Sequence, residues 1–302
     1  MTIHKPATVA ELNFPASTEQ PTPTLLEIEQ ETFRTKFNRK PFLIGHHLTD
    51  HPLLTLPELF ELSKRLPEDF VEYYAGNVPI GIDSRVQPRN GLSIQETIRR
   101  IEECGSWMAM KCVHQDPLYG QLLDRCLDEI QPLSELLDPG MCTRAAAVFF
   151  ASPGSVTPYH MDHEINFLLQ IHGTKQISIF DQTDRSVLPE EEFEKYFTGD
   201  RVHRNMQFKD EWQQKASVFE LTPGTGVHIP ANAPHWVKNG SEVSISIAMY
   251  FLTATSERID CIYQSNAHLR KLGFKPTPLG QSPLRDSVKY HAFRALRRAQ
   301  RK

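Results

Sequence analysis

Apolar residues in the first half of the chain recur every three or four positions, which is the spacing of an amphipathic helix. Residues 120–133 repeat this spacing over successive turns with four apolar side chains, Leu122, Cys126, Ile130 and Leu133. Two shorter apolar runs, residues 41–44 and 107–110, lack the helical spacing and indicate strands between the helices. We therefore predict that residues 25–140 form a helical N-terminal region that packs on the rest of the chain.

The pattern changes near residue 144, where runs rich in β-branched and aromatic residues begin and recur as far as residue 253. Glycines separate these runs at the places where turns are expected, at Gly154, Gly173, Gly224 and Gly240. A charged segment, residues 184–199, interrupts the runs and indicates a surface helix inserted between strands. Residues 141–255 are thus predicted to form an antiparallel β-barrel.

The two ends of the chain differ from both of these regions. Residues 1–24 contain several prolines among small polar residues, which predicts a flexible leader. Residues 256–302 return to helical spacing, and an apolar stripe of Ile259, Ile262 and Tyr263 lies within them. The stripe either packs on the barrel of its own chain or joins two chains, and we expect a homodimer through these C-terminal helices.

Composition narrows the class of protein without identifying it. With 302 residues, 39% hydrophobic and 23% charged, the chain can bury a sizeable core. A formal net charge of −4 gives no general reason to expect nucleic acid as a partner, and the basic segment 294–302 is typical of a solvated helix face. No apolar run is long enough to span a membrane, so no membrane partner is expected.

The cysteines indicate the compartment. There are five of them, an odd number, widely spaced and without a C-x-x-C pair, which favours a reducing environment. The first residues show no basic start followed by an apolar run, so no secretory signal is recognised. We expect a cytoplasmic location.

The strand-rich half carries a pattern suited to a metal. His160 and Asp162 are two residues apart, so on an extended strand their side chains point to the same face. With 13 histidines and 14 aspartates, chance alone gives about 0.6 such pairs in the chain. A second pair, His114 and Asp116, lies in the helical half directly before Pro117, which is typical of a helix or loop start.

A third metal ligand must come from a distant strand. Residues 223–236 supply two candidates, His228 within a predicted strand and His235 in the loop that follows it. Two histidines and one carboxylate on one face of a metal leave positions open for oxygen and organic ligands, the arrangement that iron(II) oxygenases use. The residues alone leave both candidates open.

The same residues resemble a known family. The stretch from Thr157 to Lys175 matches T-x-x-H-x-D, then N-F at Asn166, then Q-I-x-G-x-K, the run found in the Jumonji C hydroxylases, a cupin-like family of Fe(II) and 2-oxoglutarate-dependent enzymes. Residues 224–236 resemble that family's segment ending in P-H or W-H, whose last histidine binds iron. With weaker similarity from residue 33 onward, the resemblance covers most of residues 30–255.

This resemblance implies a fold, a site and a reaction. The fold would be mainly β with flanking helices, built around a double-stranded β-helix (jelly-roll, cupin-like) core. The metal-binding, catalytic residues would be His160, Asp162 and His235, leaving His228 as a pocket wall or a core residue. Fe(II) would be the cofactor and 2-oxoglutarate the cosubstrate, bound by Lys175, Thr157 and Asn166. A protein side chain, a peptide or a small molecule would be hydroxylated.

Several positions depart from the family pattern. His228 stands where the family has a tyrosine, Thr225 where an acidic residue is common, and Ser244 and Ser246 where some members have an amide. The alternative is a non-catalytic, metal-binding cupin-like regulator or ligand-binding module. A metal-dependent cupin enzyme without 2-oxoglutarate, such as an isomerase, is a further alternative. Lys175 and the residues implied to bind the cosubstrate argue against both.

Overall fold

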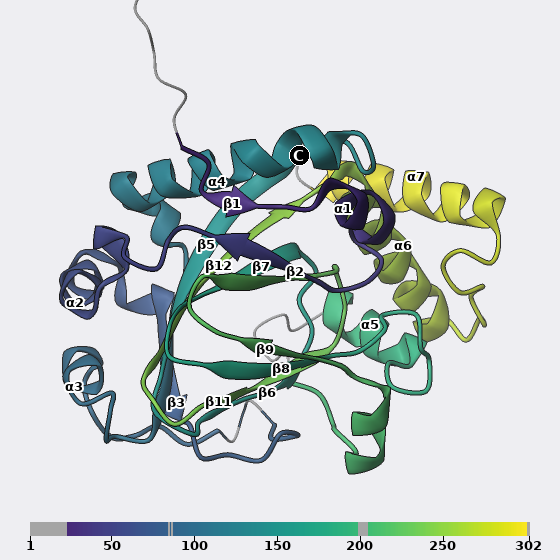
Figure 1. The fold of residues 1–302 in the computed structure, drawn as a ribbon. Coiled ribbons are helices and arrows are strands. Elements are labelled where there is room, and N and C mark those ends of the chain that lie inside the picture. The colour runs from purple at the N-terminus through teal and green to yellow at the C-terminus, as the bar shows by residue number, and fades with distance from the viewer. Residues whose placement is uncertain (1–22, 84, 86, 199–204, 301–302) are drawn as a thin grey trace, which may run out of the picture.

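The computed structural model describes residues 23–83, 85, 87–198 and 205–300, so the leader expected over residues 1–24 lies almost wholly outside the described residues. Two antiparallel sheets form the centre of the molecule (Figure 1). The larger sheet contains, in spatial order, β1 (Leu26–Glu27), β2 (Phe42–His46), β10 (Thr225–Ile229), β7 (Ile165–His172), β12 (Ser244–Leu252), β5 (Cys142–Ala151), β4 (Ser106–Met110) and β3 (Val71–Ala75). The smaller sheet contains β6 (Val156–His160), β11 (His235–Asn239), β8 (Lys175–Ile179) and β9 (Ser217–Leu221).

The helices flank these sheets. They are α1 (Gln30–Lys36), α2 (Leu56–Arg65), α3 (Ile94–Arg99), α4 (Pro117–Glu135), α5 (Glu190–Thr198), α6 (Ala254–Lys271) and α7 (Pro283–Gln300). Short 3-10 turns are found at Pro52–Leu54, Glu68–Phe70, Val113–Gln115 and Asp210–Lys215. None of the helices in the described part of the chain is long and apolar enough to cross a membrane.

The N-terminal half supplies the expected helices and, in addition, the strands β1 to β4 of the larger sheet. The two runs predicted as strands are present as β2 and β4. Strand β3 was not predicted, because its residues are too few and too polar to show a clear alternation. The N-terminal region therefore completes the sheet as well as covering it.

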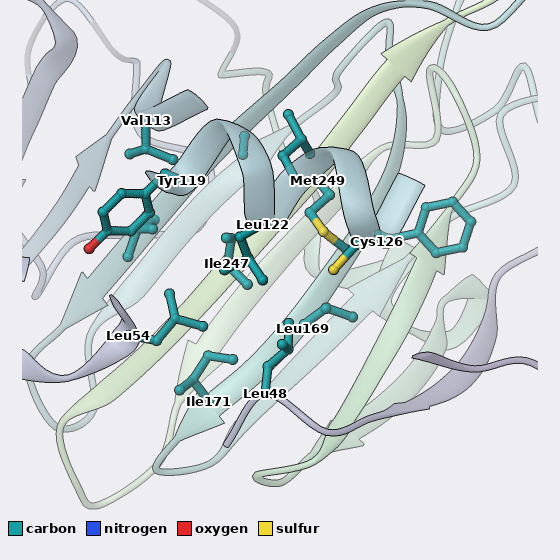
Figure 2. Close-up of a cluster of buried hydrophobic side chains, with 14 of the residues drawn as sticks. Leu48, Leu54, Val113, Tyr119, Leu122, Cys126, Leu169, Ile171, Ile247 and Met249 are labelled. Atoms are coloured by element: carbon teal, nitrogen blue, oxygen red, sulfur yellow. The ribbon is translucent and has the colours of Figure 1, made fainter. Parts of the chain in front are cut away.

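The outer face of the larger sheet holds the main hydrophobic core. Helix α4 lies across this face, and its apolar stripe, with Leu122 and Cys126, packs toward Leu169 and Met249 of the sheet (Figure 2). All four side chains are at most 3% exposed. Full burial of each such side chain contributes roughly 1.5–3 kcal/mol relative to exposure. The predicted helical stripe is confirmed.

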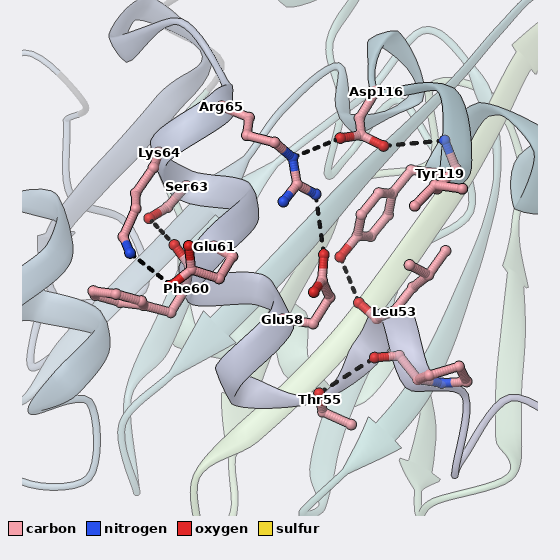
Figure 3. Close-up of polar contacts among 12 residues, drawn as sticks. Leu53, Thr55, Glu58, Phe60, Glu61, Ser63, Lys64, Arg65, Asp116 and Tyr119 are labelled. Carbon is pink, nitrogen blue, oxygen red and sulfur yellow. Dashed lines mark hydrogen bonds and ion pairs between the residues drawn. The ribbon is translucent and has the colours of Figure 1, made fainter.

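The second His-x-Asp pair starts this helix, as expected from the sequence. Asp116 is the N-cap of α4, because its side chain accepts a hydrogen bond from the Leu118 backbone N–H at 3.0 Å. The other carboxylate oxygen pairs with the Arg65 Nε of α2 at 2.9 Å (Figure 3). His114 accepts a bond from the Ala146 backbone N–H at 3.3 Å. Both residues of this pair therefore have structural partners.

The charged segment forms a shorter helix than expected. Asp184 accepts hydrogen bonds from the backbone and hydroxyl groups of Ser186, which makes a turn there, and α5 begins only at Glu190. Nor is α5 merely a surface helix, since Phe193 and Phe197 are buried. Both rings stack on Tyr263 of α6, with centroids 4.8 and 5.4 Å away.

This contact decides how the apolar stripe of α6 is used. Ile262 and Tyr263 are 0% and 1% exposed within the single chain. The stripe therefore packs on its own chain, which was the alternative to a dimer contact. The large apolar side chains that stay exposed at this end of the molecule lie in α7 and the segment before it, at Leu272, Phe274, Leu284, Val288 and Leu296.

Candidate metal centre

The structure brings His160, Asp162 and His235 together between the two sheets. His160 ends β6 and His235 begins β11, and these two residues lie directly opposite each other in the antiparallel pair. Asp162 follows two residues after His160. One donor atom from each of the three side chains lies within 4.8 Å of the others. Of the histidine, cysteine and acidic residues in the described ranges, these form the only such cluster.

The loop before His235 is held in place by the backbone of Asp162. Asn232 adopts a left-handed conformation with φ of 63°, which asparagine tolerates better than most residues. Its backbone N–H donates to the carbonyl oxygen of Asp162 at 2.6 Å. This bond ties the segment between β10 and β11, which leads into His235, to Asp162.

The two imidazole rings have the same orientation relative to their own backbone. His160 Nδ1–H donates to the Pro158 carbonyl at 2.7 Å, and His235 Nδ1–H donates to the Ala233 carbonyl at 2.9 Å. These bonds fix the tautomer and leave each Nε2 as the atom that faces Asp162, at 3.8 and 3.9 Å from Oδ2. Two donors that share an ion at about 2.1 Å lie at most about 4.2 Å apart, so these separations suit a shared cation.

A cavity of about 140 Å³ opens beside the cluster. Its walls include all six residues singled out from the sequence resemblance, namely Thr157, His160, Asp162, Asn166, Lys175 and His235. Leu168, Ile229 and Val237 add apolar surface to the same walls. The residues implied to bind a metal and those implied to bind a cosubstrate therefore face one space.

Lys175 is the most unusual residue of the cavity. Its side chain is buried, and its Nζ donates a hydrogen bond to Ser246 Oγ at 2.8 Å. Within the described ranges, no carboxylate forms an ion pair with it. Burial without an anionic partner penalises the charged ammonium and lowers the pKa of Lys175 to about 7. A buried lysine in this state is poised to receive an anion.

Other polar atoms of the cavity also lack partners. The Oδ1 atoms of Asn166 and Asn239 and the Nε2 atom of Gln87 are buried and make no hydrogen bond to any described residue. All three residues line the cavity. Because buried polar groups in folded proteins are nearly always paired, this unused capacity indicates a polar ligand.

His228 lies outside this site, on the opposite face of the larger sheet. Its Nε2 accepts the Asn38 backbone N–H at 3.0 Å, and its Nδ1–H donates to the Asn166 carbonyl at 3.2 Å. Its ring also lies among those of Phe37, Phe42 and Phe167. Burial lowers the pKa of His228 to about 3, so the ring is neutral. His228 is therefore a core residue whose hydrogen bonds are complete.

Sequence reasoning did not identify every residue of the cavity. Ser246 was noted only as a departure from the family pattern, although its place in the alternation of β12 turns it inward. The far end of the cavity was missed altogether: Glu72, Tyr74, Gln87 and Trp107. Strand β3 and the segment after it gave no signal, since they lie in a region read as helical.

Comparison with known proteins supports the fold. No family model matches the chain, and no curated protein sequence is similar to it. Among solved structures, the X-ray structure of E. coli YcfD is similar with a TM-score of 0.51 at 16% identity, covering 89% of this chain and 67% of that one. A second structure, YcfD described as a ribosomal oxygenase from Escherichia coli in complex with cobalt and 2-oxoglutarate, gives a TM-score of 0.50 at 15% identity, covering 90% and 67%. At this identity the likeness concerns the fold, and the expected cupin-like jelly roll with flanking helices is confirmed.

Proposed function

We propose that this chain is an Fe(II)- and 2-oxoglutarate-dependent dioxygenase that hydroxylates a protein side chain, a peptide or a small molecule. The observation that carries the proposal is Lys175, a buried cation without an anionic partner in the described part of the chain, in the same cavity as the His160, Asp162 and His235 cluster. A negatively charged cosubstrate at a metal supplies the missing partner.

The cluster suits iron by its chemistry. Two neutral imidazoles and one carboxylate form the donor set of non-haem iron(II) oxygenases and leave half of an octahedral coordination shell open. The backbone bonds from both Nδ1–H groups hold the rings so that their Nε2 atoms can bind the ion. We infer that His160, Asp162 and His235 are the metal ligands.

The remaining polar residues suit 2-oxoglutarate. In this proposal the Lys175 ammonium binds the carboxylate of the cosubstrate that is remote from the metal, in a charge-assisted hydrogen bond. Thr157 and Asn166, which line the same cavity, complete the hydrogen bonding of the cosubstrate. A bound carboxylate restores the pKa of Lys175 toward its usual range, so binding of the anion and protonation of the lysine reinforce each other.

Iron and 2-oxoglutarate, when bound, supply an oxidising centre formed with O₂ while the cosubstrate is decarboxylated to succinate. The protein supplies position and shielding. The apolar walls of Leu168, Ile229 and Val237 keep water from the site, and Asn232 holds the loop that presents His235. Orientation by such fixed groups is the protein's main contribution in cofactor enzymes.

A test separates this proposal from a non-catalytic metal-binding module. The protein is loaded with Fe(II) without oxygen, titrated with 2-oxoglutarate by calorimetry, and then supplied with oxygen while succinate is measured. Binding followed by succinate formation supports the oxygenase. Binding without succinate, across peptide and small-molecule panels, favours the module, and absence of 2-oxoglutarate binding to the iron-loaded protein contradicts the proposal.

We also propose a homodimer through the C-terminal helices, now by way of α7 rather than the stripe of α6. Leu284, Val288 and Leu296 lie at intervals of four and eight residues on α7 and are 77%, 62% and 46% exposed. Light scattering is expected to give twice the mass of one chain, falling to one chain in a Leu284→Lys, Val288→Lys variant. A single-chain mass for the unmodified protein at every concentration contradicts the dimer.

A further inference from the structure

The cavity extends beyond the metal cluster toward β3, the edge strand of the larger sheet. Strand register places inward-facing side chains in two rows that cross four neighbouring strands. The first row contains Glu72, Ala109, Phe149 and Ser246, and the second contains Tyr74, Trp107, Ala151 and Ser244. One row therefore runs from a carboxylate at the sheet edge to the hydroxyl that holds Lys175.

Opposite charges stand at the two ends of this row. Glu72 on β3 and Ser246 on β12 are three strand spacings apart, roughly 14 Å for strands about 4.8 Å apart. Both Glu72 and Lys175 line the cavity, and the metal cluster lines it too. The cavity thus has a lysine at the end that suits the cosubstrate and a carboxylate, whose ion pair with Lys111 lies at that end, where space is left for another molecule.

The carboxylate of Glu72 keeps capacity for a further partner. One of its oxygens, Oε1, accepts a hydrogen bond from Lys111 Nζ. The other oxygen, Oε2, makes no hydrogen bond or ion pair with any residue in the described ranges. The side chain is 27% exposed, so it is neither sealed in the core nor fully surrounded by water. A cation entering from the cavity can bind the free oxygen without displacing Lys111.

Aromatic rings line this end of the cavity. Tyr74 and Trp107 lie nearly parallel, with centroids 6.4 Å apart and planes 17° apart, and Phe149 continues the wall 6.0 Å from Trp107. The faces of such rings attract cations. Gln87 adds a buried amide nitrogen that has no hydrogen-bond partner among the described residues, which suits a carbonyl or hydroxyl oxygen next to the charged group.

We propose that Glu72, Tyr74, Trp107 and Gln87 form a subsite for a positively charged group of the substrate, an amine or a guanidinium. The substrates of this chain are then cationic, with the charged group bound at the sheet edge and the carbon to be oxidised nearer the metal cluster. The reaction in this statement rests on the proposed oxygenase function, whereas the binding does not.

Calorimetry without oxygen, on protein loaded with Zn(II) and 2-oxoglutarate, tests the subsite independently of turnover. The probes are matched pairs: N-acetyl-arginine amide with its uncharged counterpart N-acetyl-citrulline amide, and N-acetyl-lysine amide with N-acetyl-norleucine amide. Putrescine tests whether a free amine serves as well as a peptide side chain. One hydrogen bond to a charged group corresponds to roughly ten-fold to a hundred-fold in affinity, and we expect a preference of this size for at least one cationic probe.

Three variants locate the preference. Glu72→Gln keeps the shape of the side chain but is expected to abolish the preference, and Lys111→Met is expected to strengthen it by leaving the carboxylate to the probe. Glu220→Gln is the matched control, since Glu220 is a strand glutamate outside the cavity that bonds Gln176. Thermal unfolding of each variant verifies folding.

Three results overturn the subsite: equal binding of charged and uncharged partners, no binding of any cationic probe, or a preference that survives in Glu72→Gln. Each leaves the oxygenase proposal standing if 2-oxoglutarate binds in the same samples. Conversely, a cation preference in protein that fails to bind 2-oxoglutarate supports the subsite and contradicts the proposed reaction.

Discussion

The two faces of the larger sheet bury polar groups in opposite ways. On the outer face, under α1, His228 is surrounded by aromatic rings, and both of its ring nitrogens have backbone partners. Against the inner face, Lys175 of the smaller sheet has a single, neutral partner among the described residues, Ser246, and Asn166 of the larger sheet has an oxygen that bonds none of them. The outer face is complete as it stands, whereas the inner face has unused hydrogen-bonding capacity.

His228 and Lys175 are both buried ionisable groups, and their hydrogen-bond partners show which of the two belongs to a binding site. Burial lowers the pKa of both His228 and Lys175. His228 becomes neutral and uses both nitrogens, so its environment needs nothing more. Lys175 is destabilised as a cation, and an anionic ligand would reverse this. The unused hydrogen-bonding capacity around Lys175, rather than its lowered pKa, therefore indicates where a ligand binds.

The strongest test removes a donor of the metal cluster. His160→Ala or His235→Ala is expected to abolish tight binding of one divalent metal, because two remaining donors do not hold an ion firmly. The matched control is His114→Ala, which removes a histidine of the other His-x-Asp pair. Metal analysis of the purified variants decides, and full metal content in both site variants contradicts the assignment.

The next test removes the side-chain ammonium of Lys175. Lys175→Met is expected to weaken 2-oxoglutarate binding roughly ten-fold to a hundred-fold, since a hydrogen bond between charged groups is lost. Metal content should stay unchanged, because Lys175 is not a donor of the cluster. Calorimetry and metal analysis on the same samples measure both. Unaltered affinity shows that Lys175 does not bind the cosubstrate.

Stability measurements sharpen the comparison between the faces. His228→Leu is expected to lower the free energy of unfolding by about 1–3 kcal/mol, because a buried N–H and a buried carbonyl lose their partner. Lys175→Met, measured without ligands, is expected to leave stability unchanged or to raise it, because a desolvated cation is removed. Denaturant unfolding checks both, with the exposed His291→Leu as control. Equal losses of unfolding free energy in His228→Leu and Lys175→Met contradict the difference proposed between the two faces.

The finest test follows stability with pH. The pKa of Lys175 is about 7 in the folded chain and about 10.5 when unfolded, so between these values the unfolded chain binds more protons. The free energy of unfolding of the ligand-free protein should therefore rise with pH between about 7 and 10.5, by up to roughly 1.4 kcal/mol per pH unit from this group. Subtracting the curve of Lys175→Met isolates this contribution. If the unfolding free energies of the unmodified protein and Lys175→Met change with pH in parallel, the lowered pKa of Lys175 is excluded.

The sequence predicts one part of the site well because that part is local. His160, Asp162 and Lys175 lie within one short stretch, which runs from the end of β6 through β7 to the start of β8, so the spacing of residues already indicates their relation. Ser246 and Glu72 reach the cavity only through the register of β12, β5, β4 and β3. Register between distant strands depends on the packed sheet, and short segments do not encode it visibly.

The fold, like the site, has parts that local sequence patterns predict and parts that they do not. The barrel strands and α4 were predicted because their apolar patterns are long, whereas β1 and β3 are short and lie among helices. The start of α5 was misplaced because the side chain of Asp184 forms a turn that a charge pattern does not reveal. His228 could have faced either side of its strand, and the sheet pairing turned it outward.

The direct pairing of His160 with His235 also bears on how the chain folds. These residues belong to strands far apart in sequence, so loop closure and the pairing of β6 with β11 in the smaller sheet must precede assembly of the three donors. An unfolded chain offers only His160 and Asp162 as neighbours and has little affinity for the ion. Metal added during refolding should therefore leave the early folding rate unchanged, and slow the unfolding of the finished protein by mass action.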